Sequence, residues 1–210
     1  MDTTETTDLE VRIIEAAKQV FIRKGYAATT MSDVAAEVGI GRTALHYYFR
    51  TKDILFEAIF GQLLASFLPN IDRVLDEDRS ILEKMPKLID HYMWMVRSNP
   101  LLPGFIISEL KRDPEYLFQT ISKNPQQIQP VMRLRQQVED EMERGLIKRI
   151  PIVDLLTTVV SMVVFPVLIQ RPLMMSFMDN DVEQFDAYME RRKKLIVDVV
   201  MRLLSPDFKE

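Results

Sequence analysis

Apolar side chains recur at helical spacing along almost the whole chain, and this pattern predicts an all-α protein. The first stripe predicts a helix that ends near Gly25, and its members are Leu9, Ile13, Ala16, Ala17, Val20 and Phe21. A longer stripe from Ile54 to Phe67 predicts a helix that begins at Lys52 and ends near Pro69. Further helices are expected over residues 126–144, 152–170 and 182–204, and no run of residues alternates as a strand would.

Local capping signals mark two short helices after the first stripe. Thr30-Met31-Ser32-Asp33 has the form of a capping box, in which a hydroxyl and an acid three positions apart satisfy the first backbone N–H groups. Gly39 is placed to end this helix in the left-handed conformation. Ile40 and Gly41 then form a turn, and Arg42–Phe49 is expected to be the next helix.

Other helix starts are indicated by a hydroxyl and by prolines. Thr51 is well placed to cap the helix that begins at Lys52. A proline at the first helical position loses nothing by lacking an N–H group, and four prolines fit that position: Pro86, Pro100, Pro114 and Pro151.

The segment from Thr30 to Phe49 is a predicted helix-turn-helix, since it joins two short helices by a glycine-containing turn. In this motif the second helix lies in the major groove of DNA and the first braces it across the backbone. The small residues Ala35, Ala36 and Gly39 allow the two helices to approach closely. The sequence therefore predicts a DNA-binding head within residues 9–52.

The stretch from Arg12 to Phe60, which contains this motif, resembles the TetR family of transcriptional regulators. The resemblance rests on Thr30–Ala35, Gly39-Ile40 and Leu45–Lys52, and above all on Tyr47-Tyr48-Phe49 followed by Thr51-Lys52. It implies a homodimeric regulator, usually a repressor, that leaves DNA when a small molecule enters its C-terminal domain. We accordingly expect a three-helix DNA-binding head in residues 1–52, linked to a larger helical domain for ligand binding and dimerisation in residues 53–210.

The resemblance also implies which residues contact DNA. Arg42 and Thr43 begin the recognition helix and can reach base edges, where an arginine suits guanine O6 and N7. His46 departs from the family pattern, which usually has Tyr there. Arg42 could instead be a solvated charge, and aromatic residues of such a cluster often belong to the core. His46 and Tyr47 lie on the groove-facing side of the recognition helix, and Thr30, Tyr48 and Lys52 sit where the family contacts phosphates. The complete predicted set of DNA contacts is Thr30, Arg42, Thr43, His46, Tyr47, Tyr48 and Lys52.

The distribution of charge along the chain supports DNA binding by the head. The chain has a net charge of −4, but residues 9–52 hold seven Lys and Arg against four Asp and Glu, so a polyanion is expected to bind there. The chain has no cysteine and 2 histidines, which excludes disulfides and leaves a poor ligand set for a metal ion. We therefore expect no metal and no cofactor.

Residues 86–178 are rich in methionine and aromatic side chains, which suits a pocket for an apolar or amphipathic ligand. His91 and Glu109 are polar residues within this apolar pattern and could anchor such a ligand. The alternative is that most of these side chains form the core. The predicted ligand-binding residues are His91, Trp94, Met95, Phe105, Glu109, Met162 and Phe165.

The last two predicted helices, 151–170 and 182–204, are expected to form the dimer interface as a four-helix bundle with the partner. The final helix has one continuous apolar stripe, whose members are Val182, Phe185, Met189, Ile196, Val199, Val200 and Leu203. An intrachain bundle is the alternative use of the same stripe. Dimerisation is favoured because one recognition head seldom gives enough affinity.

An enzyme is disfavoured, because the chain has no glycine-rich phosphate loop, no Ser-His-Asp order and no metal cluster. A dimeric helical ligand-binding protein without operator binding is the alternative, and the basic Arg42, Arg50 and Lys52 beside Tyr48 argue against it. The favoured interpretation is a repressor with three partners: double-stranded operator DNA, a small-molecule effector and a second copy of the chain.

The sequence predicts a cytoplasmic protein. Its first residues are acidic and polar and show no signal peptide. The most apolar stretch, Leu155–Ile169, contains Thr157, Ser161 and Pro166 and is too short for a confident membrane span, so no membrane partner is expected.

Overall fold

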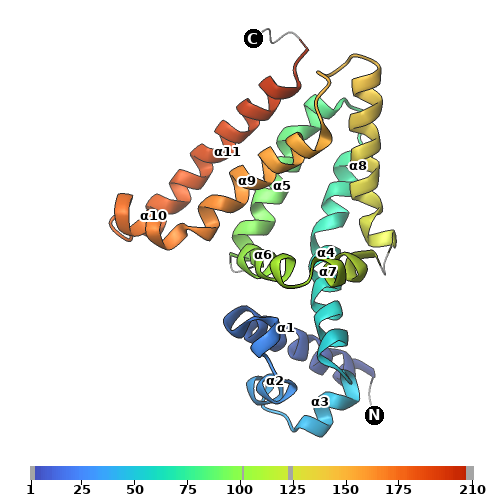
Figure 1. Cartoon of the computed structure of the whole chain (residues 1–210), viewed down its shortest axis with the longest axis vertical. Helices are drawn as coiled ribbons and strands as arrows, with labels where there is room; N and C mark the ends of the chain where they lie inside the picture. Colours follow the sequence, from blue (N-terminus) through green and yellow to red (C-terminus); the bar gives the residue numbers. More distant parts are fainter. Residues whose placement is uncertain (1–2, 101, 123–124, 207–210) are drawn as a thin grey trace. The chain divides into compact units, whose positions relative to one another are not determined.

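All regular secondary structure of the described chain is helical, which confirms the all-α prediction. The computed structural model describes residues 3–100, 102–122 and 125–206, and no strand occurs among them (Figure 1). The helices are α1 (Thr3–Ala28), α2 (Met31–Val38), α3 (Arg42–Tyr48), α4 (Lys52–Leu75), α5 (Ile81–Ser98), α6 (Leu102–Arg112), α7 (Pro114–Ser122), α8 (Pro125–Glu143), α9 (Ile152–Leu168), α10 (Gln170–Phe177) and α11 (Val182–Leu204).

The chain divides into two compact units. The head unit consists of Met1–Ser66 and Gly104–Gln127, and the body unit consists of Phe67–Pro103 and Ile128–Glu210. The head unit therefore includes α6 residues from Gly104 and α7 as well as the three N-terminal helices. The boundary predicted between residues 52 and 53 separates DNA binding from ligand binding, whereas these two units are defined by compactness. The predicted boundary therefore stays a prediction.

The core of the head unit is built on the first apolar stripe. The backbone of α1 leaves helical geometry at Gly25 (φ 76°, ψ 162°), where the sequence predicts the end of that helix. Phe21 of α1 packs edge-on against Phe56 of α4, with ring centroids 6.0 Å apart, and Phe105 of α6 lies 5.6 Å from Phe56. Three aromatic rings from three helices thus meet in one buried cluster.

Two prolines lie inside helices that the sequence predicts to end or begin there. α4 continues through the exposed Pro69, and α5 begins at Ile81, ahead of Pro86. The predictions of a helix end at Pro69 and a helix start at Pro86 are wrong. Buried side chains continue the apolar stripe of α4 after Pro69, and this packing outweighs one missing N–H group. Ser80 and Glu83 form the capping box that begins α5.

The body unit is centred on α5, α9 and α11, which pack against one another (Figure 1, green, orange and red). α11 begins and ends where the sequence predicts. Much of its apolar stripe faces inward, because Phe185, Met189, Ile196 and Val200 are buried in the intrachain core. These four side chains are therefore not available for an interface with a second copy.

A proline and an arginine fix α9 against α11. Pro166 lies inside α9 and has no N–H group to donate to the carbonyl of Met162, four residues earlier. Arg192 of α11 donates its Nε–H to that carbonyl over 2.8 Å. The carbonyl that Pro166 leaves without a helical partner is therefore satisfied by a neighbouring helix.

No single helix of the described residues is long and apolar enough to cross a membrane. Together, α9 and α10 reach that length and composition, but the chain bends by 65° between them.

Candidate nucleic-acid interface

The helix-turn-helix forms with the caps that the sequence predicts. Thr30 accepts a hydrogen bond from the backbone N–H of Asp33 over 3.2 Å, and the Asp33 carboxylate accepts from the Thr30 N–H over 2.9 Å. Gly39 has φ 79° and ψ 31°, and its N–H donates to Ala35 and Ala36. The Thr51 hydroxyl accepts from the Ile54 N–H over 3.2 Å at the start of α4. The predicted capping box, left-handed glycine and threonine cap are confirmed.

One side of α3 is buried and the other is open. Leu45 and Phe49 are buried in the head core, as their spacing of four predicts. Arg42 and Thr43 are exposed at the start of the helix, and Tyr47 is 80% exposed. The Tyr48 ring is half-buried and meets the Tyr47 ring edge-on, with centroids 5.3 Å apart. α3 therefore presents an arginine, a hydroxyl and a phenol together on its outer surface.

His46 lies between two arginines that are each four residues away. Arg42 Nε donates to His46 Nε2 over 3.1 Å, and His46 Nδ1 lies 3.1 Å from the carbonyl oxygen of Arg50. Both ring nitrogens of the imidazole therefore have hydrogen-bond partners within the head.

Two of the predicted phosphate contacts have polar groups that are already engaged within the protein. The Thr30 hydroxyl takes part in the capping box. The Lys52 ammonium donates to the carbonyls of Tyr26 (2.8 Å) and Thr29 (3.1 Å), near the end of α1. It thus joins the start of α4 to the end of α1. To make its predicted phosphate contact, the same ammonium group would have to bind a phosphate in addition to these two carbonyls.

Tyr26 is a structural residue that sequence reasoning missed. Two cations lie over its ring, with Lys52 Nζ and Arg112 Cζ each 4.3 Å from the ring centroid. Burial, and then the hydrogen bond that its hydroxyl donates to Asp53, raise the pKa of Tyr26. A single aromatic residue after a glycine gives no signal of this arrangement, because Arg112 lies far away in the sequence.

Ion pairs brace α1 against α2. Arg23 pairs with Glu37, and Lys24 donates to Asp33 over 2.7 Å. The hydrogen bond from Lys24, followed by those from Thr30, lowers the pKa of Asp33 to about 2. Two of the basic side chains that make the head cationic are thus used to hold the motif together.

The body unit holds five of the predicted ligand-binding residues, but it does not bring all of them into its core. Met95 and Met162 pack partly buried against the main core cluster, and His91 is half-buried on α5. Trp94 and Phe165 are 56% and 57% exposed. Their predicted role as ligand contacts stays a prediction.

Phe105 and Glu109 belong to the head unit. Phe105 is part of the aromatic cluster with Phe21 and Phe56. Glu109 is buried, and its carboxylate accepts a 2.7 Å hydrogen bond from Arg112 Nε. Both side chains have packing partners in the head, and their predicted ligand contacts likewise stay predictions.

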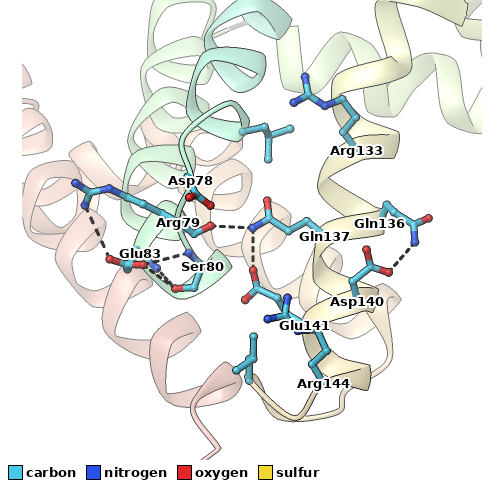
Figure 2. Close-up of a pocket in the computed structure, with 12 residues that line it drawn as sticks. Asp78, Arg79, Ser80, Glu83, Arg133, Gln136, Gln137, Asp140, Glu141 and Arg144 are labelled. Carbon is cyan, nitrogen blue, oxygen red and sulfur yellow. Dashed lines mark hydrogen bonds and ion pairs between the residues drawn. The ribbon is translucent and has the colours of Figure 1, made fainter.

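The body unit contains a polar pocket of about 550 Å³ that none of the predicted ligand-binding residues lines. Figure 2 shows the residues from the α4–α5 connection and α8 that surround it. Gln137 at its wall donates to the carbonyl of Arg79 (3.0 Å) and to the carboxylate of Glu141 (2.8 Å). No group of three or more side chains suited to a metal ion occurs in the part of the chain that the structure describes.

Comparison with known sequences agrees with the motif. Residues 13–59 match the sequence profile described as "Bacterial regulatory proteins, tetR family". An uncharacterized HTH-type transcriptional regulator of Bacillus subtilis, YfiR, is 35% identical over 81 residues. That alignment covers 39% of this chain and 39% of the relative, so it spans well under half of either protein.

Solved structures match this chain over most of its length. A TetR family transcription regulator from Marinobacter aquaeolei VT8 superposes with a TM-score of 0.68 at 17% identity, over 97% of this chain and 98% of that one. The regulator FadR of Bacillus subtilis, solved in complex with stearoyl-CoA, superposes with a TM-score of 0.67 at 16% identity, over 92% and 98% of the two chains. At these identities the similarity establishes the fold.

Proposed function

We propose that the chain is a member of the tetR family of bacterial regulatory proteins, and that it is a sequence-specific, DNA-binding transcriptional repressor that acts in the cytoplasm as a homodimer. The observation that carries the proposal is the outer surface of α3, where Arg42, Thr43 and Tyr47 are exposed opposite the buried Leu45. A recognition helix requires such a division between a packed face and a face open to the groove. Under this proposal the chain is a regulator rather than an enzyme.

The proposed DNA contacts fall into two groups. Arg42 and Thr43 are assigned to base edges, and Tyr47 and His46 to the groove-facing side of α3. Thr30, Tyr48 and Lys52 are assigned to the phosphate backbone, which positions the head without reading sequence.

Replacing Arg42 by Ala should relax specificity at one base pair of each half-site. A bidentate arginine–guanine contact is worth about 1–3 kcal/mol of discrimination, whereas non-specific binding should change little. The measurement is a gel-shift titration against a preferred site selected from random DNA and against its single-base variants. Arg171→Ala, which removes an exposed arginine of α10, is the matched control. Unchanged base preference in Arg42→Ala would remove Arg42 from the recognition surface.

The proposed dimer interface is the exposed apolar face of α9. Val153, Leu156 and Val160 are exposed on it, and Leu195 is exposed on the adjacent α11. The Thr157 hydroxyl donates to the Val153 carbonyl of its own helix over 2.7 Å, so this polar side chain can be covered without losing a hydrogen bond. A contiguous apolar face of this kind is typical of an interaction surface. A two-fold dimer would place two recognition helices on an inverted repeat.

We also propose that a small apolar or amphipathic effector releases the repressor from its operator. Two features support this class of ligand: the methionine-rich side chains that pack on the body core, such as Met95 and Met162, and the stearoyl-CoA bound by the structurally similar FadR. A ligand can shift operator affinity only as far as it discriminates between the two states of the repressor.

Long-chain acyl compounds are the first probes for such an effector. A true effector should raise the thermal midpoint of the protein and weaken operator binding by roughly 5- to 150-fold, the usual range of allosteric coupling. Thermal shifts followed by operator titrations with each hit provide the measurement. Compounds that stabilise the protein but leave operator affinity unchanged would contradict an effector role, and short-chain acyl compounds at equal concentration serve as the control.

A further inference from the structure

The two hydrogen bonds of His46 define the protonation state of its ring. The Arg42 guanidinium can only donate, so the Nε2 atom that it approaches over 3.1 Å must carry no proton. The Arg50 carbonyl can only accept, so the Nδ1 atom 3.1 Å away must carry one. The geometry therefore requires neutral His46 with its proton on Nδ1.

This ring also constrains the side chain that begins the recognition helix. Residues 42 and 46 lie one turn apart on α3, so their side chains meet on the same face of the helix. The imidazole binds Arg42 through Nε, which leaves the two terminal amino groups of the guanidinium available to an acceptor pair such as guanine O6 and N7. An exposed arginine otherwise samples many rotamers and loses that freedom on binding.

We propose that His46 is a positioning residue for base recognition: it holds Arg42 in the orientation in which Arg42 reads a base. The proposal rests on the proposed DNA-binding function and deepens it, because it assigns specificity at one base pair to a side chain that acts through its neighbour. It also gives a physical reason for a histidine at this position of the recognition helix, since a tyrosine hydroxyl would stand further from the helix backbone than imidazole Nε2.

Replacing His46 by glutamine or by asparagine distinguishes this positioning role from one in which His46 only caps the C-terminal end of α3. Gln at position 46 can place a carbonyl oxygen near the position of Nε2 and still accept from Arg42, whereas Asn can place an amide N–H near the position of Nδ1 and still donate to Arg50. His46→Gln should therefore keep base discrimination, and His46→Asn and His46→Ala should lose roughly 2- to 10-fold of it, the cost of ordering one long side chain. Discrimination kept by Asn and lost in Gln would overturn the proposal in favour of a cap.

A double-mutant cycle tests the dependence on Arg42. In the Arg42→Ala background, His46→Ala should cause no further loss of discrimination at that base pair, because the group that it positions is gone. Independent, additive losses would mean that His46 acts on DNA without Arg42, which would overturn the positioning role.

The tautomer that the two hydrogen bonds of His46 require can be measured in the full-length protein without DNA. Long-range ¹H–¹⁵N spectra at mildly alkaline pH report the tautomer of each histidine, and the chain has only 2, so the His91→Gln variant assigns His46 directly. We expect the Nδ1–H tautomer in the wild type. An Nε2–H tautomer would overturn the proposal, whatever the protein does with DNA. A wild-type chain without any preferred DNA sequence would instead overturn the proposed function, and with it the role in recognition.

Discussion

A chain with both Leu156→Glu and Val160→Glu should sediment as a monomer and lose about a thousand-fold in affinity for its operator. Leu156 is 59% exposed on α9, so a glutamate is tolerated in the isolated subunit but would place unpaired charge in the proposed interface. The monomer would keep one head. Specific complexes bind with dissociation constants of about 10⁻⁸ to 10⁻¹¹ M, whereas non-specific ones bind at about 10⁻⁴ to 10⁻⁶ M, so losing the second head should remove most of the difference.

A matched control is available on α8. Val131 and Met132 are also large exposed apolar residues of the body unit, and Val131→Glu with Met132→Glu adds the same charge. This control should remain dimeric and bind its operator normally. Analytical ultracentrifugation and operator titration of both variants decide between the two surfaces. A dimeric α9 variant together with a monomeric α8 variant would move the interface from α9 to α8.

The head could be predicted in detail because its signals are local. Thr30 and Asp33 cap α2, Gly39 ends it with a positive φ, and Leu45 and Phe49 face the core, all as their spacing indicates. Each of these features depends on residues within a few positions of one another. Local rules of this kind hold when no distant contact competes with them.

Predictions failed or stayed open where packing between different helices decides the structure. Helix α4 passes through Pro69 because its later side chains are buried in a small cluster with Leu88 of α5, and Leu134 of α8 packs against that cluster. The apolar stripe of α11 looks equally suited to a partner and to an intrachain core, and only packing shows that Met189 and Ile196 face inward. Periodicity identifies the apolar face of a helix but not what covers it.

The same limit applies to the polar residues around the candidate site. Arg112 lies over the Tyr26 ring and Arg192 satisfies the Met162 carbonyl, and in both cases the partners are distant in sequence. Nothing in the local pattern distinguishes these arginines from solvated charges. Glu109 differs from these two, because its partner Arg112 lies only three residues later on α6, a spacing at which helical side chains meet.

A buried polar network in the body unit joins the end of α4 and the start of α5 to α8. Lys84 is 2% exposed and donates to the Leu75 carbonyl (2.8 Å) and to Gln137 Oε1 (2.9 Å). Glu141 is 4% exposed, and both of its oxygens accept from the Ile81 N–H at 3.0 Å. Gln137 connects the two by donating to Glu141. A cation thus satisfies a carbonyl at the end of one helix, and an anion satisfies an N–H group at the start of the next, as helix dipoles favour.

Glu141→Leu should lower the free energy of unfolding of the body by about 3–5 kcal/mol, because it leaves the buried Lys84 without the anion of its network and Ile81 without an acceptor. Lys84→Met with Glu141→Leu should recover part of that loss, since an apolar pair leaves no buried charge. Urea unfolding followed by the fluorescence of Trp94, at fixed protein concentration, provides the measurement, because this single tryptophan lies on α5. Glu143→Leu, which removes an exposed acid of the same helix, should change stability by no more than about 0.5 kcal/mol. Equal effects of Glu141→Leu and Glu143→Leu would mean that the network contributes nothing beyond surface charge.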